Sequence, residues 1–203
     1  GGADSNANPA LRLALDKAKA ANMPNDNVER ALKKATSSTD GANYEEITYE
    51  GYGPGGVAIL VEALTDNRNR TATNVRVIFN RNGGSLGETG SVSYMFDRKG
   101  YLAIEREHLL IDEDTLLEKI LEAGAEDLVT SDEVFEIYTE AEDFTTVRDF
   151  LEREFTLAQA ELTMLPQTTV SLNEAQQNQF DQLIEKLEDD DDVFDVYTSI
   201  DNS

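Results

Sequence analysis

The fold is decided by two β-strand patterns joined by a glycine-rich turn, ITYEGYGPGGVAILVEAL at residues 47–64. In the first pattern Ile47, Tyr49 and Gly51 alternate with their neighbours, which is the period of a half-buried strand. The second pattern, residues 57–64, is an apolar run rich in β-forming side chains. The stretch therefore predicts a β-hairpin.

A helix and a further strand are predicted directly after this hairpin. Ala72, Val75 and Phe79 recur at helical spacing, and the glycine pair at 83–84 is typical of a helix end. Residues 92–96 alternate between apolar and polar side chains and predict a strand. The order up to this point is ββαβ.

The next part of the chain predicts the ferredoxin-like order βαββαβ, after a turn at 97–100. Its elements are a strand at 101–105, a helix at 114–123, strands at 127–130 and 134–138, a helix at 144–155 and a strand at 158–165. The tail adds a strand at 168–172, a helix at 174–187 and a strand at 193–198. Because this tail is too small to be a domain, we expect it to complete the sheet begun at residue 45.

Two short amphipathic helices are predicted before the hairpin. Asn8 and Pro9 begin the first, and Pro24 begins the second. The fold class is thus α+β, with an N-terminal helical domain followed by two α/β sandwich domains, the last one ferredoxin-like and inserted in the other. The expected domains are a helical domain at 1–43, a discontinuous domain at 44–98 plus 166–203, and an acidic domain at 99–165.

Composition narrows the classes of function. The 203 residues include no cysteine and one histidine, so disulfides and thiolate metal sites are excluded. The sequence has no apolar run of about 18 residues, so we expect no membrane span. The lack of cysteine fits a reducing compartment, and we expect a cytoplasmic location. The sequence leaves the oligomeric state open, and a monomer is favoured. We expect no cofactor, metal or small-molecule substrate. Since the chain begins with glycine, we also expect its N-terminus to be truncated.

The charge is unevenly distributed. The net charge is −24, which by itself disfavours nucleic acid because phosphates are bound by Lys and Arg. However, residues 1–40 have a net charge of +1, residues 41–100 of −1, and residues 101–203 of −24. This asymmetry predicts a polarised molecule that orients itself toward a polyanion.

Four short motifs match enzymes or binding modules but lack the required context. Residues 51–56 read G-x-G-x-x-G, yet a strand follows where a dinucleotide site needs a helix. Residues 83–87 read G-x-S-x-G but end a helix, and His108 is a poor candidate for the base of a triad. Residues 99–101 open like an RNA-recognition signature without its aromatics. The acidic run 188–192 lacks the central glycine of a calcium loop, so a helix-to-strand turn is favoured.

The basic residues carry the functional hypothesis. Arg30, Lys33 and Lys34 share one helical face, which is either an anion-binding stripe or a solvated face. Arg68 and Arg70 begin a helix, where a positive charge opposes the helix dipole and a bound phosphate would remove the conflict. The alternative is a pair of exposed arginines bridged to Glu62 or Asp66. The candidate phosphate contacts are Arg12, Lys17, Lys19, Arg30, Lys33, Lys34, Arg68 and Arg70.

Longer segments resemble a known family. These are the segments at 8–24, at 49–56 (YEGYGPGG) and at 64–71 (LTDNRNRT), and they closely resemble the YebC/PmpR family. The resemblance covers essentially the whole chain. It implies a helical domain followed by two α+β domains, with no known cofactor or active site. Family members start with a basic stretch upstream of residue 1, and Ala10 stands where they tend to carry a basic residue.

The resemblance leaves two functions open. Bacterial members are usually described as DNA-binding transcriptional regulators, while mitochondrial relatives are translational activators and some bacterial members are ribosome-associated translation factors. Both functions need a surface that binds anions. We therefore expect a non-enzymatic, nucleic-acid-binding regulator of gene expression acting on DNA or, alternatively, on rRNA in the ribosome. A protein-interaction adaptor working through its acidic domain is a third possibility.

Overall fold

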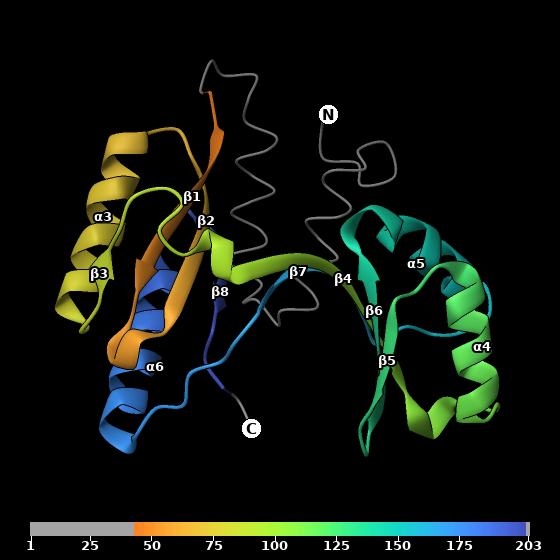
Figure 1. Cartoon of the computed structure of the whole chain (residues 1–203). Coiled ribbons are helices and arrows are strands. Elements are labelled where there is room, and N and C mark those ends of the chain that lie inside the picture. The colour runs from red at the N-terminus through yellow and green to blue at the C-terminus, as the bar shows by residue number, and fades with distance from the viewer. Residues whose placement is uncertain (1–42, 202–203) are drawn as a thin grey trace. The chain divides into compact units, whose positions relative to one another are not determined.

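The computed structural model describes residues 43–201, and these residues divide into two compact units. One unit comprises 43–97 with 165–201, and the other comprises 98–164. Each unit has a sheet of four strands and two long helices (Figure 1). The predicted α+β class is confirmed. The predicted helical domain lies outside the described residues apart from Asn43, and the three domain boundaries stay a prediction.

The sheet of the first unit is built on the predicted hairpin. Strand β1 (Glu45–Tyr52) pairs antiparallel with β2 (Ala58–Thr65), and a short 3-10 turn (Pro54–Gly56) joins them. Strand β3 (Ser85–Leu86) pairs with β1, and β8 (Val193–Thr198) pairs with β2, which gives the order β3-β1-β2-β8. The last strand of the tail thus completes the sheet begun at residue 45, as predicted.

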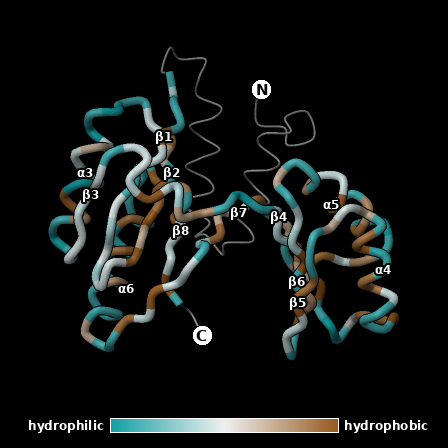
Figure 2. The backbone as a smooth tube through the Cα atoms, viewed as in Figure 1, coloured by the Kyte–Doolittle hydropathy of each residue, from teal (hydrophilic) through white to brown (hydrophobic). Residues whose placement is uncertain are grey.

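Helices α3 (Arg68–Arg81) and α6 (Glu174–Asp189) cover one face of this sheet. Asn67 caps α3 and Asn173 caps α6, in each case by accepting a hydrogen bond from a first-turn backbone N–H. The core between helices and sheet consists of Val57, Ile59, Val61, Val75, Phe79, Phe180, Leu183, Leu187, Val193 and Ile200. Figure 2 shows hydrophobic stretches in the strands and helices and hydrophilic residues along most loops.

The second unit has the predicted ferredoxin-like order, with its sheet arranged β5-β6-β4-β7. Its elements are β4 (Phe96–Glu105), α4 (Glu113–Ala123), β5 (Asp127–Thr130), β6 (Val134–Glu140), α5 (Phe144–Glu152) and β7 (Gln159–Pro166). Both helices pack on the same face of the sheet, where Leu102, Ile137 and Phe144 are buried in the core.

Three local predictions are wrong. Residues 93–95 form a 3-10 turn instead of a strand, and at its start the buried carboxylate of Glu50 accepts hydrogen bonds from the N–H groups of Val92 and Ser93. The expected turn at 97–100 lies inside β4, where Gly100 faces the core: a Cβ there would overlap Thr139 Oγ1 and lie 2.8 Å from Phe144 Cδ2. The expected strand at 168–172 is reduced to one bridge between Val170 and Ile200.

Candidate nucleic-acid interface

The structure tests the surroundings of only two of the eight candidate phosphate contacts. Arg12, Lys17, Lys19, Arg30, Lys33 and Lys34 lie outside the described residues. Arg68 and Arg70 both lie in the first turn of α3, as the sequence predicted.

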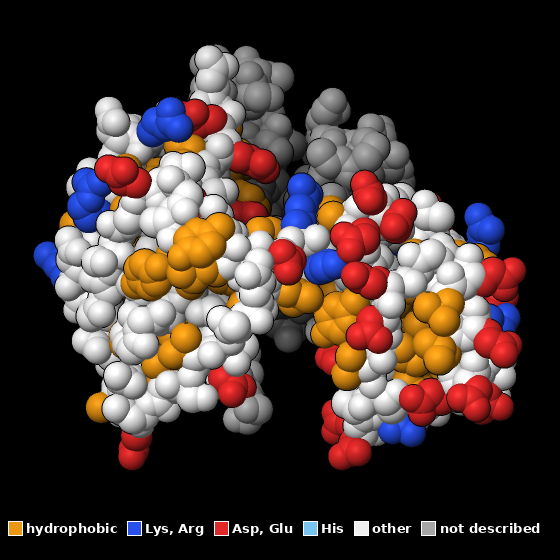
Figure 3. Space-filling view, in the orientation of Figure 1, with side chains coloured by type: hydrophobic (Ala, Val, Ile, Leu, Met, Phe, Trp, Pro, Cys, Tyr) orange, Lys and Arg blue, Asp and Glu red, His pale blue; other side chains and the backbone are white. Residues whose placement is uncertain are grey.

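Helix α3 has an unusual charge for this chain. Its 14 residues include four arginines (Arg68, Arg70, Arg76 and Arg81) and no aspartate or glutamate. All four side chains are exposed. Figure 3 shows Lys and Arg side chains along the edge of the first unit over α3, while Asp and Glu side chains spread over residues 98–164. This helix is therefore the basic surface of the described residues.

Much of the N-terminus of α3 already has partners within the protein. The Asn67 Oδ1 atom accepts a hydrogen bond from the backbone N–H of Arg70 at 3.1 Å. The Asn67 N–H in turn donates to Thr65 Oγ1 at 2.9 Å. The free donors for an external phosphate are therefore fewer than the sequence alone suggests.

The Arg70 side chain points to two carboxylates. Its Nη2 atom lies 2.9 Å from Asp66 Oδ1 and 3.1 Å from Asp192 Oδ2. These hydrogen bonds raise the pKa of Arg70 above its ordinary value. The positive charge that opposes the dipole of α3 is thus balanced by the protein's own carboxylates. The alternative prediction of a bridge to Asp66 is confirmed for Arg70 but not for Arg68, and the longer-range partner Asp192 was not predicted.

Asp192 joins three elements at this corner of the first unit. Only 5% of its side chain is exposed, and it accepts a hydrogen bond from the hydroxyl of Thr71 at 2.8 Å as well as from Arg70. The Thr71 and Thr65 hydroxyl oxygens lie 2.7 Å apart. The end of β2, the start of α3 and the turn before β8 are therefore held by one buried polar network.

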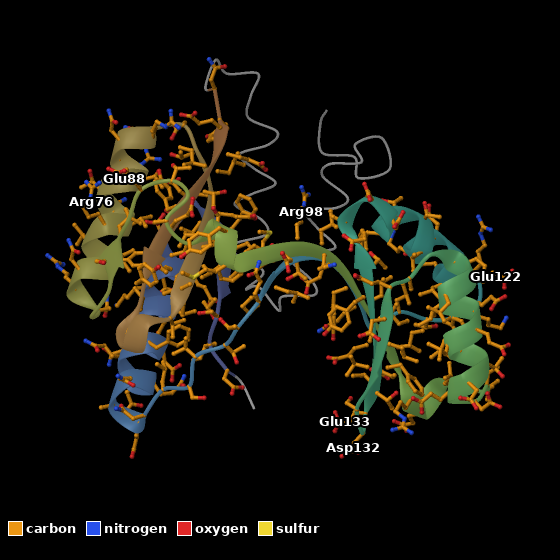
Figure 4. All side chains as sticks on the ribbon, viewed as in Figure 1. Arg76, Glu88, Arg98, Glu122, Asp132 and Glu133 are labelled. Atoms are coloured by element: carbon orange, nitrogen blue, oxygen red, sulfur yellow. The ribbon has the colours of Figure 1, made fainter. Side chains whose placement is uncertain are left out.

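Arg68, Arg76 and Arg81 form no ion pair with another described residue, in contrast to Arg70. Arg68 lies near Tyr49: burial raises the pKa of that tyrosine, and the positive charge of Arg68 opposes the increase. Arg76 lies farther along α3 and projects outward (Figure 4). Arg76 and Arg81 were not predicted as phosphate contacts from the sequence. The absence of acidic residues from 68–81 was the signal that could have identified them.

The acidity of the second half of the chain is shared between both units. Residues 98–164 hold six basic and nineteen acidic side chains, and residues 165–201 hold one and ten. Helix α6 packs beside α3 in the first unit and exposes Glu174, Asp181, Glu185, Glu188 and Asp189. The near-neutral and acidic halves of the sequence therefore do not correspond to the two units, because the acidic tail belongs to the first unit.

A second feature of this unit is the loop after β3. The carboxylate of Glu50, whose side chain is 4% exposed, accepts hydrogen bonds from the backbone N–H groups of Gly90, Val92 and Ser93 at 2.7, 3.1 and 2.7 Å. Burial would raise the pKa of Glu50, but these hydrogen bonds outweigh that effect and lower it. Gly90 has a φ of 90°, which favours glycine. The carboxylate of Glu50 on β1 thus holds the loop in place. The side chain of Tyr94 in this loop is exposed.

Residues 43–201 show no calcium loop, no metal site and no membrane-spanning helix. The acidic run 188–192 is the predicted helix-to-strand turn, in which Asp190 Oδ1 accepts a hydrogen bond from the Asp192 N–H. No group of His, Asp and Glu side chains in this range has the arrangement of a metal site. Helices in the same range are too short or too polar to cross a bilayer.

Comparison with known proteins identifies the family. Residues 1–38 match the TACO1/YebC protein N-terminal domain, and residues 44–200 match the TACO1/YebC second and third domain. The chain is 68% identical, over its whole length and 84% of the relative, to a "Probable transcriptional regulatory protein" of Enterococcus faecalis. A protein of the same description from Ligilactobacillus salivarius is 65% identical over 99% of this chain and 83% of its own length.

A solved structure supports the same assignment. A conserved hypothetical protein from Aquifex aeolicus matches with a TM-score of 0.74 and 43% identity, over 99% of this chain and 83% of that one. The names of the relatives support a regulator of gene expression. The chain belongs to the TACO1/YebC family.

Proposed function

We propose that this protein is a nucleic-acid-binding regulator of gene expression, acting in the cytoplasm as a DNA-binding transcriptional regulator, without enzymatic activity. The observation that carries the proposal is α3, a helix of 14 residues with four arginines and no acidic residue in a chain with a net charge of −24. Such a segment is the basic surface that binding to phosphates requires. The names of the relatives support transcription as the process.

The arginines of α3 have different roles in this proposal. Arg68, Arg76 and Arg81 contact phosphates, because no described carboxylate is paired with them. Arg70 positions the start of the helix through Asp66 and Asp192 and contributes less to binding. The six basic residues between Arg12 and Lys34 add further phosphate contacts from the N-terminal part.

The neighbouring helix favours a second candidate, binding to rRNA on the ribosome. The major groove of DNA is about 12 Å wide, and packed helices lie about 8–10 Å apart. A duplex with α3 in its major groove would therefore bring its phosphates toward the acidic side chains of α6. Contact between the outer side of α3 and one phosphate strand avoids this repulsion. Recognition of RNA by backbone and shape needs no base-reading helix.

A salt titration of binding tests the proposal. The full chain is titrated against labelled duplex DNA and against ribosomes, at several salt concentrations from about 0.05 to 0.2 M. We expect saturable binding whose log K falls linearly with log salt, with a slope of about −0.9 for each phosphate contacted on DNA. Tight DNA binding favours transcription, and ribosome binding with weak DNA binding favours translation. Binding to neither at low salt would contradict the proposal.

A further inference from the structure

The sheet of the second unit has one face covered by α4 and α5 and an opposite face with a different composition. Alternation along β4 directs Leu102 and Ile104 toward the helices and Tyr101 and Ala103 away from them. In the same way Ile137 of β6 lies in the core, while its neighbours Glu136 and Tyr138 belong to the opposite face. No helix of residues 98–164 covers this second face, which we call the tyrosine face.

Two tyrosines on the central strands form the middle of the tyrosine face. Tyr101 and Tyr138 are opposite each other in the β4–β6 register, with ring centroids 5.4 Å apart and ring planes tilted by 57°. The Tyr101 hydroxyl donates to Glu136 Oε1 at 2.8 Å. Burial and this hydrogen bond raise the pKa of Tyr101 above its ordinary value. Both rings are half-buried and keep part of their surface in contact with solvent.

The charges around these rings are negative. Glu136 and Glu161 act electrostatically on Tyr101, and Asp127 acts on Tyr138 together with Glu136. Lys99 is the one basic residue at the outward positions of β4, β5, β6 and β7 among the described residues. Its Nζ atom lies 2.8 Å from both Glu126 and Glu140, so its charge is already compensated.

We propose that the tyrosine face binds an Arg- or Lys-rich peptide segment of a partner protein. Aromatic rings attract the cationic groups of Arg and Lys through their π faces, and Arg stacks on such rings. The carboxylates of Asp127 and Glu136 beside the rings complement the same cations. The rings and carboxylates thus recognise one kind of ligand.

Charge decides between this ligand and RNA. Ferredoxin-like sheets with aromatics on their central strands can stack unpaired bases, but the RNA backbone then needs basic residues near the rings. Here the charged groups nearest the rings are carboxylates, which repel phosphates. The tyrosine face is therefore distinct from the phosphate-binding surface proposed for α3, and its function is independent of that proposal.

The test measures binding of a labelled cationic peptide by the full chain. The probe is a fluorescein-labelled peptide of alternating Arg and Gly, followed by fluorescence anisotropy near physiological salt. The combined change Asp127→Asn and Glu136→Gln should weaken binding about tenfold, and Tyr138→Leu should weaken it several-fold. The matched control is Glu118→Gln with Glu122→Gln on the exposed side of α4, which changes the net charge equally (Figure 4 labels Glu122). It should leave binding nearly unchanged.

Several outcomes would overturn this inference. If the control variant loses as much peptide binding as the tyrosine-face variant, the peptide is attracted by the overall negative charge of the protein and does not bind a specific site. If the protein binds single-stranded RNA and Tyr138→Leu abolishes this binding, the tyrosine face stacks RNA bases instead of binding a cationic peptide. Changes in the NMR signals of Tyr101 and Tyr138 when Arg12, Lys17 and Lys19 are replaced by Gln, without peptide, would assign it to this chain's own N-terminal segment. Thermal melts of each variant identify any loss caused by unfolding.

Discussion

Arg70 and Asp192 form an ion pair at 3.1 Å although they are separated by 122 positions in the sequence. Arg70 lies in the first turn of α3 and Asp192 directly precedes β8, so the pair ties the start of the basic helix to the C-terminal part of the first unit. Asp192 is buried and Arg70 is partly exposed, at 5% and 46% of their side-chain surfaces. The pair therefore stabilises the first unit mainly through its buried carboxylate.

Replacement of Asp192 by Asn should destabilise the first unit. The change removes the negative charge that pairs with Arg70. In the unsubstituted protein the Thr71 hydroxyl donates to the Asp192 carboxylate, and the change can place an N–H group of Asn next to this donor. A buried polar group without a suitable partner costs about 1–3 kcal/mol of unfolding free energy. Urea unfolding measures the loss. Asp189→Asn, at the exposed end of α6, is the matched control and should have little effect.

The roles of Arg68 and Arg70 should separate in a pair of neutralised variants. Arg70→Gln should lower stability by disrupting the network around Asp192, with a modest effect on nucleic-acid binding. Arg68→Gln should preserve stability and weaken binding. The slope of log K against log salt should become less steep by about one unit, which corresponds to the loss of one phosphate contact. Urea unfolding and salt titrations are measured on both proteins. A larger binding defect in Arg70→Gln than in Arg68→Gln would contradict these roles.

Glu50→Gln should loosen the loop after β3. Gln keeps one acceptor oxygen but replaces the other with an amide group, which cannot accept from Gly90, Val92 or Ser93. We expect a loss of about 1–3 kcal/mol and faster hydrogen exchange at these three backbone amides. Glu46→Gln is the control, because Glu46 lies on the same strand but is exposed. Unchanged exchange in Glu50→Gln would show that the loop is fixed by other contacts.

The pH dependence of stability should contain a contribution from Glu50. Its pKa is lower in the folded protein than in the unfolded chain, so its ionised form stabilises the fold. This stability is fully present above the ordinary pKa of glutamate, about 4.3, and is lost as the pH falls through the lower folded value. Unfolding free energies measured between neutral and acid pH should therefore fall less steeply in Glu50→Gln. A parallel decrease in both proteins would contradict this assignment.

The periodicity of the sequence predicts most of the fold because the burial of each element is periodic. Alternation in β1 and helical spacing in α3 are local patterns, and both elements form where they were predicted. The loop at 93–95 also alternates, but its conformation depends on Glu50, a residue on another strand. The segment 97–100 was expected to be a turn because it ends in glycine. In the structure Gly100 lies inside β4, where the close approach of Phe144 leaves no room for a Cβ atom.

The candidate site was less predictable than the fold. Arg68 and Arg70 could be identified from their place at the start of a helix. The sequence did not show that the two side chains have different partners. The partner of Arg70 comes from beyond the inserted second unit, and no local pattern indicates that contact. The sequence predicted that the tail completes the first sheet, but it did not predict that the acidic helix α6 packs beside α3.

The central claim is that α3 is the phosphate-binding surface, and the most direct test reverses its unpaired charges. Binding to duplex DNA and to ribosomes is compared for the original chain, for Arg76→Glu with Arg81→Glu, and for the control Arg153→Glu with Lys186→Glu at exposed positions outside α3. We expect the α3 variant to bind at least about tenfold more weakly to its preferred target, with a smaller salt slope, and the control to bind nearly normally. Equal binding by the α3 variant and the original chain would contradict the claim.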